Sequence, residues 1–320
     1  MLSKSIFLFL AVLILASCEK EELPIEKTDR GGVISSEVFI NSNYQYQIWY
    51  DLEENKTVKK SLKTDWDIAF DCSGENAIYL NSSLAMRAAN TGSKDFENSF
   101  DKNTLNFRGD HNSGIRDSLA LKNWNSGNVY LLDLGYTPEG NERGFVKIQF
   151  LGENNGTYTF KYAKDGESAR EAKVSKNTTY NRVGFSIEND SEILFEPPKD
   201  QFDLLFSQYT HVFYEPYTPY LVTGVLLNTN NTMAYCDSVN EFGAITIENV
   251  NETLFANQKD AIGYDWKEID FTSANAVFIT DMSKNYILKT RSAFLFKLHF
   301  IDFYTSKGEK GNFVFEYQRL

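Results

Sequence analysis

The chain has 320 residues, with 32 lysines and arginines against 44 aspartates and glutamates, which gives a formal net charge of −12. A chain this acidic repels phosphate backbones, so nucleic acid is excluded as an expected partner. Only three histidines and three cysteines occur, which leaves little material for a zinc site or a serine–histidine–aspartate triad. Phosphate-binding glycine motifs are absent from the sequence as well, and we therefore do not expect an enzyme.

The N-terminus has the pattern of a signal peptide. Lys4 precedes an apolar run over residues 6–15, which is too short to span a bilayer as a helix. Residues 15–17 then lead into Cys18, and this sequence resembles the lipobox of bacterial lipoproteins. The resemblance implies that residues 1–17 are removed and that Cys18 is lipidated, which anchors the chain to the outer membrane.

Residues 18–39 are expected to form a tether behind the lipid anchor. The segment Glu19-Lys20-Glu21-Glu22 resembles the acidic surface-export signal of Bacteroidota lipoproteins, which implies a body exposed outside the cell. A charged run this short fits a plain solvated linker equally well.

The rest of the chain carries the same blocks twice, in the same order, over residues 46–162 and 183–317. We therefore predict a tandem duplication of one β-rich unit. The matching blocks are 66–70 with 202–206, 78–83 with 219–224, 129–133 with 277–281, 146–151 with 296–301, and 156–162 with 311–317. An aspartate recurs in the first of these blocks, as Asp67 and Asp203. We expect it to fix a turn or to cap a backbone group in both copies.

Apolar and polar residues alternate within the blocks, as strands require. Phe296, Leu298 and Phe300 point to one side of their block, while Lys297 and His299 point outward. Clusters of asparagine, glycine, aspartate and serine separate the blocks and indicate hairpin turns. The prediction is therefore an all-β fold of two antiparallel β-sandwich units.

The two units are assigned to residues 40–165 and 180–320, with the boundary in the polar stretch 164–181. They form either two separate cores or one pseudo-symmetric body. Cys72 and Cys236 fall at different places in the two copies, so pairing and free thiols both remain open.

The strand blocks and their order resemble the HmuY family of haem-binding surface lipoproteins. The resemblance is carried by residues 66–70, 296–304 and 311–317, together with the lipobox. It implies an all-β fold and a role in capturing haem, or a related tetrapyrrole, and passing it to a TonB-dependent outer-membrane receptor. It also implies two axial iron ligands, histidines or methionines, in the middle region. That region does not align here, so no ligand is carried over.

His211 is the first candidate for a haem ligand, because it lies in a short insertion of the second copy. Its neighbours Tyr209, Phe213, Tyr214 and Tyr217 offer the flat apolar rings that a porphyrin pocket needs. The alternative is an aromatic loop that covers a sheet face, with His211 bound to a backbone carbonyl.

Met233 is the candidate second ligand, because it follows a polar turn and has little reason to be packed there. His111 is the other option, although we expect a solvated loop histidine, and it requires the two copies to bring their loops together. Met86 matches Leu227 and is expected in the core, while Met282 closes a shared strand and is a weaker candidate.

Two functions therefore stand side by side. The first is a surface-exposed lipoprotein that binds haem for iron acquisition. The second is a structural or interaction lipoprotein of the same fold that binds protein or glycan and not haem. The scarcity of histidine favours the second, and the aromatic insertion around His211 favours the first.

Overall fold

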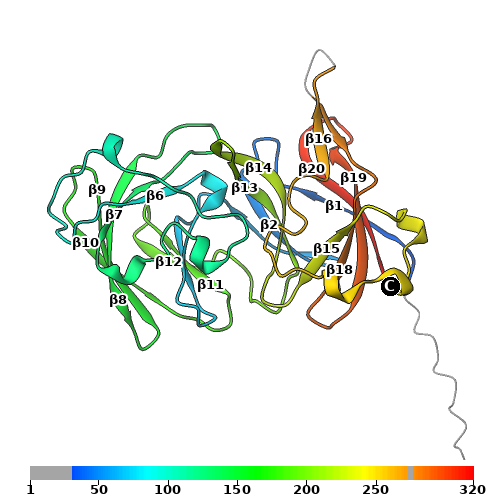
Figure 1. The fold of residues 1–320 in the computed structure, drawn as a ribbon, viewed down its shortest axis with the longest axis horizontal. Helices are drawn as coiled ribbons and strands as arrows, with labels where there is room; N and C mark the ends of the chain where they lie inside the picture. The colour runs from blue at the N-terminus through cyan, green and yellow to red at the C-terminus, as the bar shows by residue number, and fades with distance from the viewer. Residues whose placement is uncertain (1–30, 273–276) are drawn as a thin grey trace, which may run out of the picture. The chain divides into compact units, whose positions relative to one another are not determined.

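The computed structural model describes residues 31–272 and 277–320, so the predicted signal peptide and Cys18 lie outside the described residues. The described chain forms 20 β-strands and seven short 3₁₀ helices, without an α-helix (Figure 1). None of the helices in this described part is long and apolar enough to cross a bilayer. The all-β prediction is thus confirmed.

One pair of sheets is built from a continuous stretch of the chain and is called the β4–β12 sandwich. Its first sheet has the order β12-β11-β4-β5 and its second the order β10-β9-β8-β7-β6. The strands are β4 (Ile68–Asp71), β5 (Ile78–Leu80), β6 (Arg87–Asn90), β7 (Val129–Asp133), β8 (Phe145–Asn154), β9 (Thr157–Lys164), β10 (Arg170–Ser175), β11 (Arg182–Ser186) and β12 (Ser191–Ile193).

A second pair of sheets uses both ends of the described chain and is called the terminal sandwich. Its sheets have the orders β14-β13-β2-β3 and β1-β20-β19-β18-β15, which match those of the other sandwich strand for strand. The strands are β1 (Ile34–Phe39), β2 (Tyr46–Asp51), β3 (Lys56–Leu62), β13 (Leu204–Tyr214), β14 (Tyr217–Leu227), β15 (Met233–Asp237), β18 (Asn285–Lys289), β19 (Leu295–Tyr304) and β20 (Lys310–Arg319).

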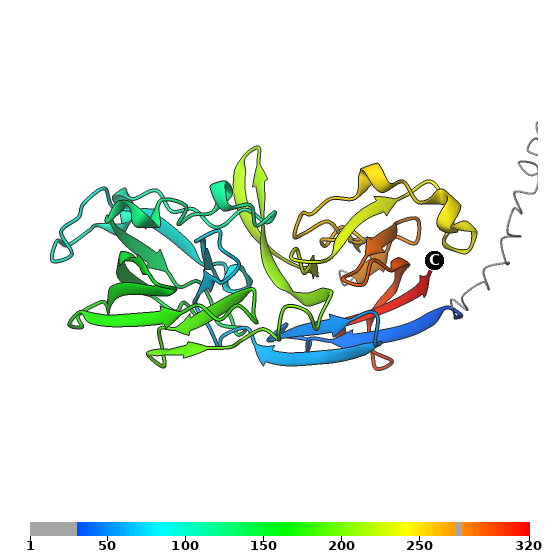
Figure 2. The ribbon, with the colours of Figure 1, turned by 90° about the horizontal axis from the view of Figure 1, so that it is seen from below.

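Aromatic side chains fill both sandwiches. Phe70, Phe150 and Phe160 lie in the core of the β4–β12 sandwich, and Phe206 and Phe315 lie in the core of the terminal sandwich. A third buried cluster joins the outer faces of the two four-stranded sheets. It contains Trp49, Trp66, Ala69, Phe195, Phe202, Leu205, Tyr209, Val222 and Leu226. The two sandwiches therefore pack against each other through an apolar layer of their own, with β2, β13 and β14 between the outer sheets (Figures 1 and 2).

Strand pairing crosses the boundary that the sequence suggests. β2 pairs with β13 and β4 pairs with β11, so segments 40–165 and 180–320 each contribute strands to both sandwiches. The expected linker at 164–181 contains β10, which pairs with β9. The expected tether 18–39 is also too long, because β1 pairs with β20 and completes the edge of a sheet.

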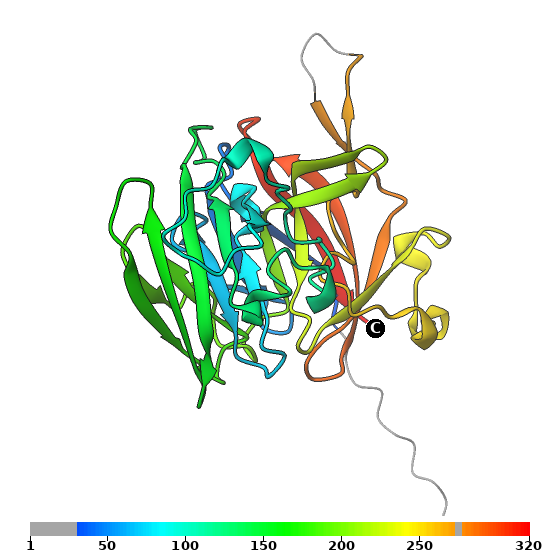
Figure 3. The same ribbon diagram turned by 60° about the vertical axis from the view of Figure 1, so that its left-hand side comes forward.

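The remaining elements lie outside the two sandwiches. β16 (Lys267–Asp270) and β17 (Val277–Thr280) form a separate two-stranded ribbon that projects from the terminal sandwich (Figure 3). The 3₁₀ helices are η1 (Ser82–Leu84), η2 (Lys102–Thr104), η3 (Arg116–Ser118), η4 (Trp124–Ser126), η5 (Phe242–Ala244), η6 (Ile247–Asn249) and η7 (Glu252–Leu254). Cys72 is buried and Cys236 is exposed, and both are free thiols.

Candidate functional site

His211 lies on a long hairpin, where the sequence suggested an aromatic loop. β13 and β14 pair without interruption from Leu204 opposite Leu227 to Tyr214 opposite Tyr217. The extra residues of the second copy thus extend two strands, whose tip rises beside the segment around residue 115 (Figure 2). Alternation along β13 places His211 on the same face as Tyr209.

The imidazole of His211 is half-buried among aromatic rings and has a free nitrogen. Its ring centroid lies 4.9 Å from that of Phe213 and 4.9 Å from that of Tyr264. The Nδ1 atom is buried and has no hydrogen-bond partner among the described residues, so the alternative of a satisfied loop histidine does not describe it. Burial lowers the pKa of His211, Asp260 opposes this and His111 adds to it. The side chain is therefore neutral at pH 7 and keeps a lone pair for a metal.

His111 lies beside the same hairpin. Its ring stacks on that of Tyr214, with the centroids 5.7 Å apart and the planes 23° apart. Its Nδ1 accepts the Ser113 backbone N–H at 3.0 Å and lies 2.8 Å from Ser113 Oγ. The loop is anchored by Asp110, which accepts the backbone N–H groups of Leu80 and Ala120 at 2.8 and 2.9 Å. The two parts of the chain that carry His111 and His211 are thus brought together by the fold.

Met233 is remote from this pair. It opens β15 opposite Lys289, next to Thr232, whose hydroxyl contacts Asp203 at the far end of β13. His211 lies seven residues along the strand from Leu204, which is about 23 Å at about 3.3 Å per residue. Met233 and His211 therefore do not share a site.

The other histidine and methionines are not at the hairpin either. His299 is 6% exposed, stacks on Phe242 at 3.9 Å and lies 3.2 Å from Glu316, so the expected outward residue is covered by η5. Met86 is buried in the core, as expected, and Met282 is exposed next to β17.

The aromatic residues singled out from the sequence divide into two groups. Tyr209 is buried in the cluster between the sandwiches, with its hydroxyl unpartnered among the described residues. Phe213, Tyr214 and Tyr217 are 44%, 58% and 44% exposed at the tip of the hairpin. Tyr220 faces His211 across the hairpin and is 58% exposed, which extends this aromatic surface.

Three residues of the site were missed by the sequence reasoning. Tyr264 packs on His211, and Asp260 bonds to Asn112 and so links the 258–264 segment to the His111 loop. Lys259 lines a cavity of about 20 Å³ together with His111 and Tyr209. No local motif marks these residues, because only the tertiary fold brings the three segments together.

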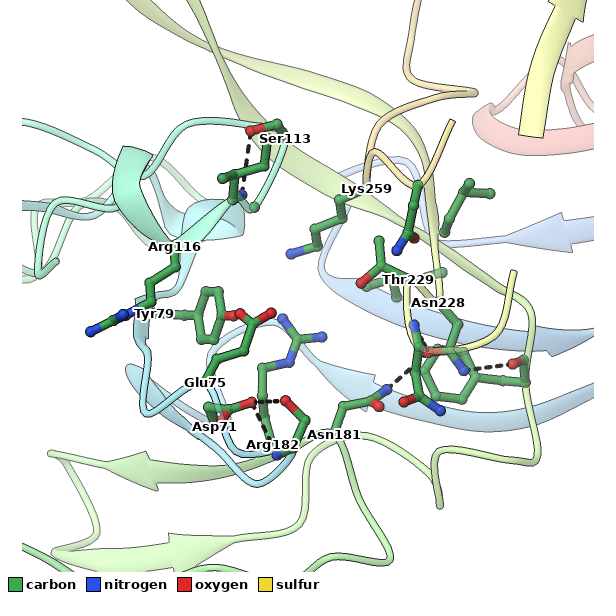
Figure 4. Close-up of a pocket in the computed structure, with 18 of the residues that line it drawn as sticks. Asp71, Glu75, Tyr79, Ser113, Arg116, Asn181, Arg182, Asn228, Thr229 and Lys259 are labelled. Atoms are coloured by element: carbon green, nitrogen blue, oxygen red, sulfur yellow. Dashed lines mark hydrogen bonds between the residues drawn. The ribbon is translucent and has the colours of Figure 1, made fainter. Parts of the chain in front are cut away.

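A larger pocket of about 640 Å³ adjoins this cavity (Figure 4). The two share Tyr79, Gly114, Arg182 and Lys259 as lining residues. The cavity next to His111 is large enough for about one water molecule, whereas an organic cofactor requires several hundred Å³. A porphyrin at His111 and His211 therefore requires the hairpin to move away from the loop.

Comparison with known proteins identifies one family. The family model described as HmuY protein matches residues 43–317. This single match spans both predicted copies, and it corrects the expectation that each copy is a family unit of its own. A search of curated proteins finds no match.

Several solved structures are similar in part. Apo PinO from Porphyromonas gingivitis is 9% identical, with 91% of this chain and 98% of that chain covered at a TM-score of 0.36. A Bacteroides vulgatus protein described as HmuY-like and heme binding is 10% identical, with 88% and 90% covered and a TM-score of 0.23. The apo HmuY analog of Tannerella forsythia is 12% identical, with 91% and 98% covered and a TM-score of 0.24.

Proposed function

The chain belongs to the HmuY family, whose members are not enzymes, and we propose that it binds haem at the tip of the β13–β14 hairpin. One observation carries the proposal. The neutral imidazole of His211, with a free buried nitrogen, contacts the exposed ring of Phe213, and His111 stacks on Tyr214 of the same hairpin. Imidazole is a common axial ligand of haem iron, and aromatic side chains cover a porphyrin face well.

His211 and His111 are the proposed axial ligands, and Phe213, Tyr214 and Tyr217 are the proposed contacts to the porphyrin. Burial lowers the pKa of His211, so its imidazole is already neutral and has no extra proton to lose before it binds iron. His111 needs a change of tautomer, because its Nδ1 accepts the Ser113 N–H and its Nε2 therefore carries the proton in the free protein. With Nδ1–H donating to Ser113 Oγ instead, Nε2 is free to bind iron.

Entry of haem separates Tyr214 from His111. Their rings are stacked, and the cavity beside His111 has a volume of only about 20 Å³. Beyond Tyr209 the strands pair only with each other, and the last side chains, Phe213, Tyr214 and Tyr217, are exposed. Movement confined to this tip keeps the Thr210 hydrogen bond to Ser82 and the burial of Val212. The apolar area gained against the porphyrin offsets the loss of that stacking.

Location and delivery form the second part of the proposal. Cys18 carries the lipid, the body is displayed on the cell surface, and haem passes to a TonB-dependent receptor. Support comes from the lipobox at residues 15–18 and from the family match. Replacement of Cys18 by alanine is expected to abolish incorporation of labelled palmitate and to release the protein into the medium.

The test is an absorption titration of the lipid-free protein, residues 19–320, with ferric haem. We expect a saturable Soret band at one haem per chain, and a loss of affinity of at least about tenfold in His211→Ala, one ligand bond being worth more than about 1.4 kcal/mol. Two control variants change other candidate ligands. His299→Gln carries the residue found at the matching position 149, and Met233→Leu keeps the volume.

Both controls are expected to titrate like the wild type. A haem affinity in His211→Ala equal to that of the wild type places the haem elsewhere. No band beyond that of an unrelated acidic protein leaves the interaction lipoprotein, for which the exposed rings of Phe213, Tyr214 and Tyr217 form a ready protein or glycan surface.

A further inference from the structure

The pocket of about 640 Å³ contains a cation without a partner. The ammonium group of Lys259 points into this pocket (Figure 4), and it has no hydrogen bond or ion pair with any described residue. Its backbone is fixed on both sides, since Leu227 N–H donates to Lys259 O at 2.7 Å and Lys259 N–H donates to Ser113 O at 3.3 Å. The side chain is partly buried. A cation held inside a pocket without a protein partner points to a ligand that neutralises it.

The stem of Lys259 is held in place by a glycine. Gly114 has a φ of +72°, and a Cβ added to it would lie 3.3 Å from Lys259 Cδ. The lysine therefore runs along the bare backbone of Gly114 toward the pocket. This close approach orients the ammonium without giving it an acceptor.

Two of the charged groups of the pocket are held by the protein, whereas Glu75, Arg116 and Asp117 line it as exposed side chains. Arg182 is held by Glu196, with Nη2 3.0 Å from Oε2. The carboxylate of Asp71 accepts the backbone N–H groups of Ser73, Gly74 and Asn76 at 2.9–3.1 Å. Among the described residues of the lining, Lys259 is thus the partly buried cation that has no hydrogen bond or ion pair.

One wall of the pocket is apolar. Phe202, Leu205 and Leu227 line it, and the ring of Tyr79 lies on the other side, where Arg182 covers it at 5.4 Å. A volume of this size suits a small organic molecule. We propose that the pocket binds a small organic anion, a carboxylate with an apolar body, through an ion pair with Lys259.

The site has a predictable pH dependence. Arg182, Asp110, Glu196 and Asp260 act electrostatically on Lys259, and Asp71, Glu75, Arg116 and Asp117 line the same pocket. Burial, aided by Arg182, lowers the pKa of Lys259 to about 7 in the empty pocket, and the three carboxylates oppose this. A bound anion raises that pKa, so binding takes up a proton near neutral pH and strengthens as the pH falls from about 8 to about 6.

The test uses 4-fluorobenzoate and its neutral isostere 4-fluorobenzamide, followed by fluorine NMR line broadening on the lipid-free protein. We expect saturable broadening of the benzoate, stronger at pH 6 than at pH 8, and a far weaker effect on the benzamide. Lys259→Met is expected to weaken benzoate binding at least about tenfold, about 1.4 kcal/mol. The matched control Lys122→Met removes an exposed charge elsewhere and is expected to bind like the wild type.

Other outcomes overturn the proposal. The proposal is wrong if benzoate and benzamide bind equally well, or if Lys259→Met binds benzoate like the wild type. It is also wrong if about 10 mM benzoate, a concentration at which millimolar affinities are detected, shows no broadening. Lys259→Met removes a partly buried, unpaired charge, so we expect the variant to fold. The pH dependence of benzoate binding to the wild type tests the proposal without any substitution. The proposal is independent of haem binding, because His211→Ala is expected to leave benzoate binding unchanged.

Discussion

Two buried aspartates hold corresponding crossovers of the chain. Asp203 accepts the backbone N–H of Leu52, just after β2, at 2.9 Å. Asp67 accepts the backbone N–H of Ile187, just after β11, at 2.7 Å and pairs with Arg143 at 2.7 Å. Each carboxylate therefore ties a strand to a neighbour more than a hundred residues away. The expectation that these residues cap backbone groups is confirmed by these bonds.

Asp67→Ala is expected to lower the free energy of unfolding by about 3–5 kcal/mol, because Arg143 loses its partner and the Ile187 N–H loses its acceptor. Urea unfolding followed by tryptophan fluorescence measures the change. The exposed Asp165→Ala serves as the control and should remain within about 0.5 kcal/mol of the wild type. A similar loss in both variants would contradict the role given to Asp67.

The second prediction concerns Asp203 and the pH dependence of the free energy of unfolding. Burial raises its pKa from 3.8 to about 6, against the opposing effects of the Leu52 N–H and Arg291. The folded state thus binds more protons than the unfolded state between about pH 4 and 6, so this contribution is full below about pH 4 and is lost as the pH rises through 6. Asp203→Asn should lack this fall of up to about 3 kcal/mol in stability. If the free energy of unfolding changes with pH in the same way in the wild type and in Asp203→Asn, this role of Asp203 is refuted.

The β13–β14 hairpin combines a buried base with an exposed tip. Tyr209 lies in the buried cluster between the sandwiches, whereas Phe213 and Tyr217 are exposed beyond it. The hydroxyl of Tyr209 has no partner among the described residues and burial raises its pKa, so the phenol is neutral and unsatisfied. The base therefore sets stability, and the tip is free for binding.

Substitutions at the two ends of the hairpin should separate these roles. Tyr209→Phe removes an unsatisfied hydroxyl and should leave the free energy of unfolding unchanged or raise it by up to about 1 kcal/mol. Phe213→Ser should stay within about 0.5 kcal/mol of the wild type yet weaken haem binding. Thermal unfolding and the haem titration, run on both variants, are the measurements. A destabilised Phe213→Ser would mean that the tip is part of the core.

At the scale of the whole molecule, the two sandwiches do not coincide with the two predicted copies. β2 and β3 come from the first predicted copy but complete the sheet of β13 and β14, and β11 and β12 return to β4 and β5. The cluster around Trp49, Trp66 and Phe195 then joins the two four-stranded sheets. Neither segment 40–165 nor segment 180–320 contains a complete pair of sheets.

We therefore expect one cooperative unfolding transition. Scanning calorimetry should give equal calorimetric and van't Hoff enthalpies. The isolated segment 40–165 should remain unfolded, because β2 and β3 lack their partner strands. Two resolved transitions, or a folded 40–165 fragment, would show that the sandwiches are independent.

The sequence predicts strands better than it predicts their partners. Alternation identifies β19, where Phe296, Leu298 and Phe300 are buried as expected. It fails for Lys297 and His299 on the other face, which the distant residue Phe242 covers. Side-chain alternation is a local property of a strand, whereas the elements that bury its second face come from far along the chain.

The candidate site shows the same limit. His211 and its aromatic neighbours stand out by composition, and the fold does place them on one hairpin. The approach of His111 to Tyr214 and of Tyr264 to His211 depends on pairing over 50 to 100 residues, which leaves no local pattern. Met233 looked suitable because of its polar turn, but register places it at the opposite end of β13.

The central claim is that His111 and His211, from distant parts of the chain, hold one haem iron. Electron paramagnetic resonance of the ferric complex tests it most directly, with His211→Ala and His111→Ala beside the wild type. The account predicts a low-spin signal of two axial imidazoles in the wild type and a high-spin signal in each variant. The same spectrum in all three proteins, or a high-spin signal in the wild type, would contradict it.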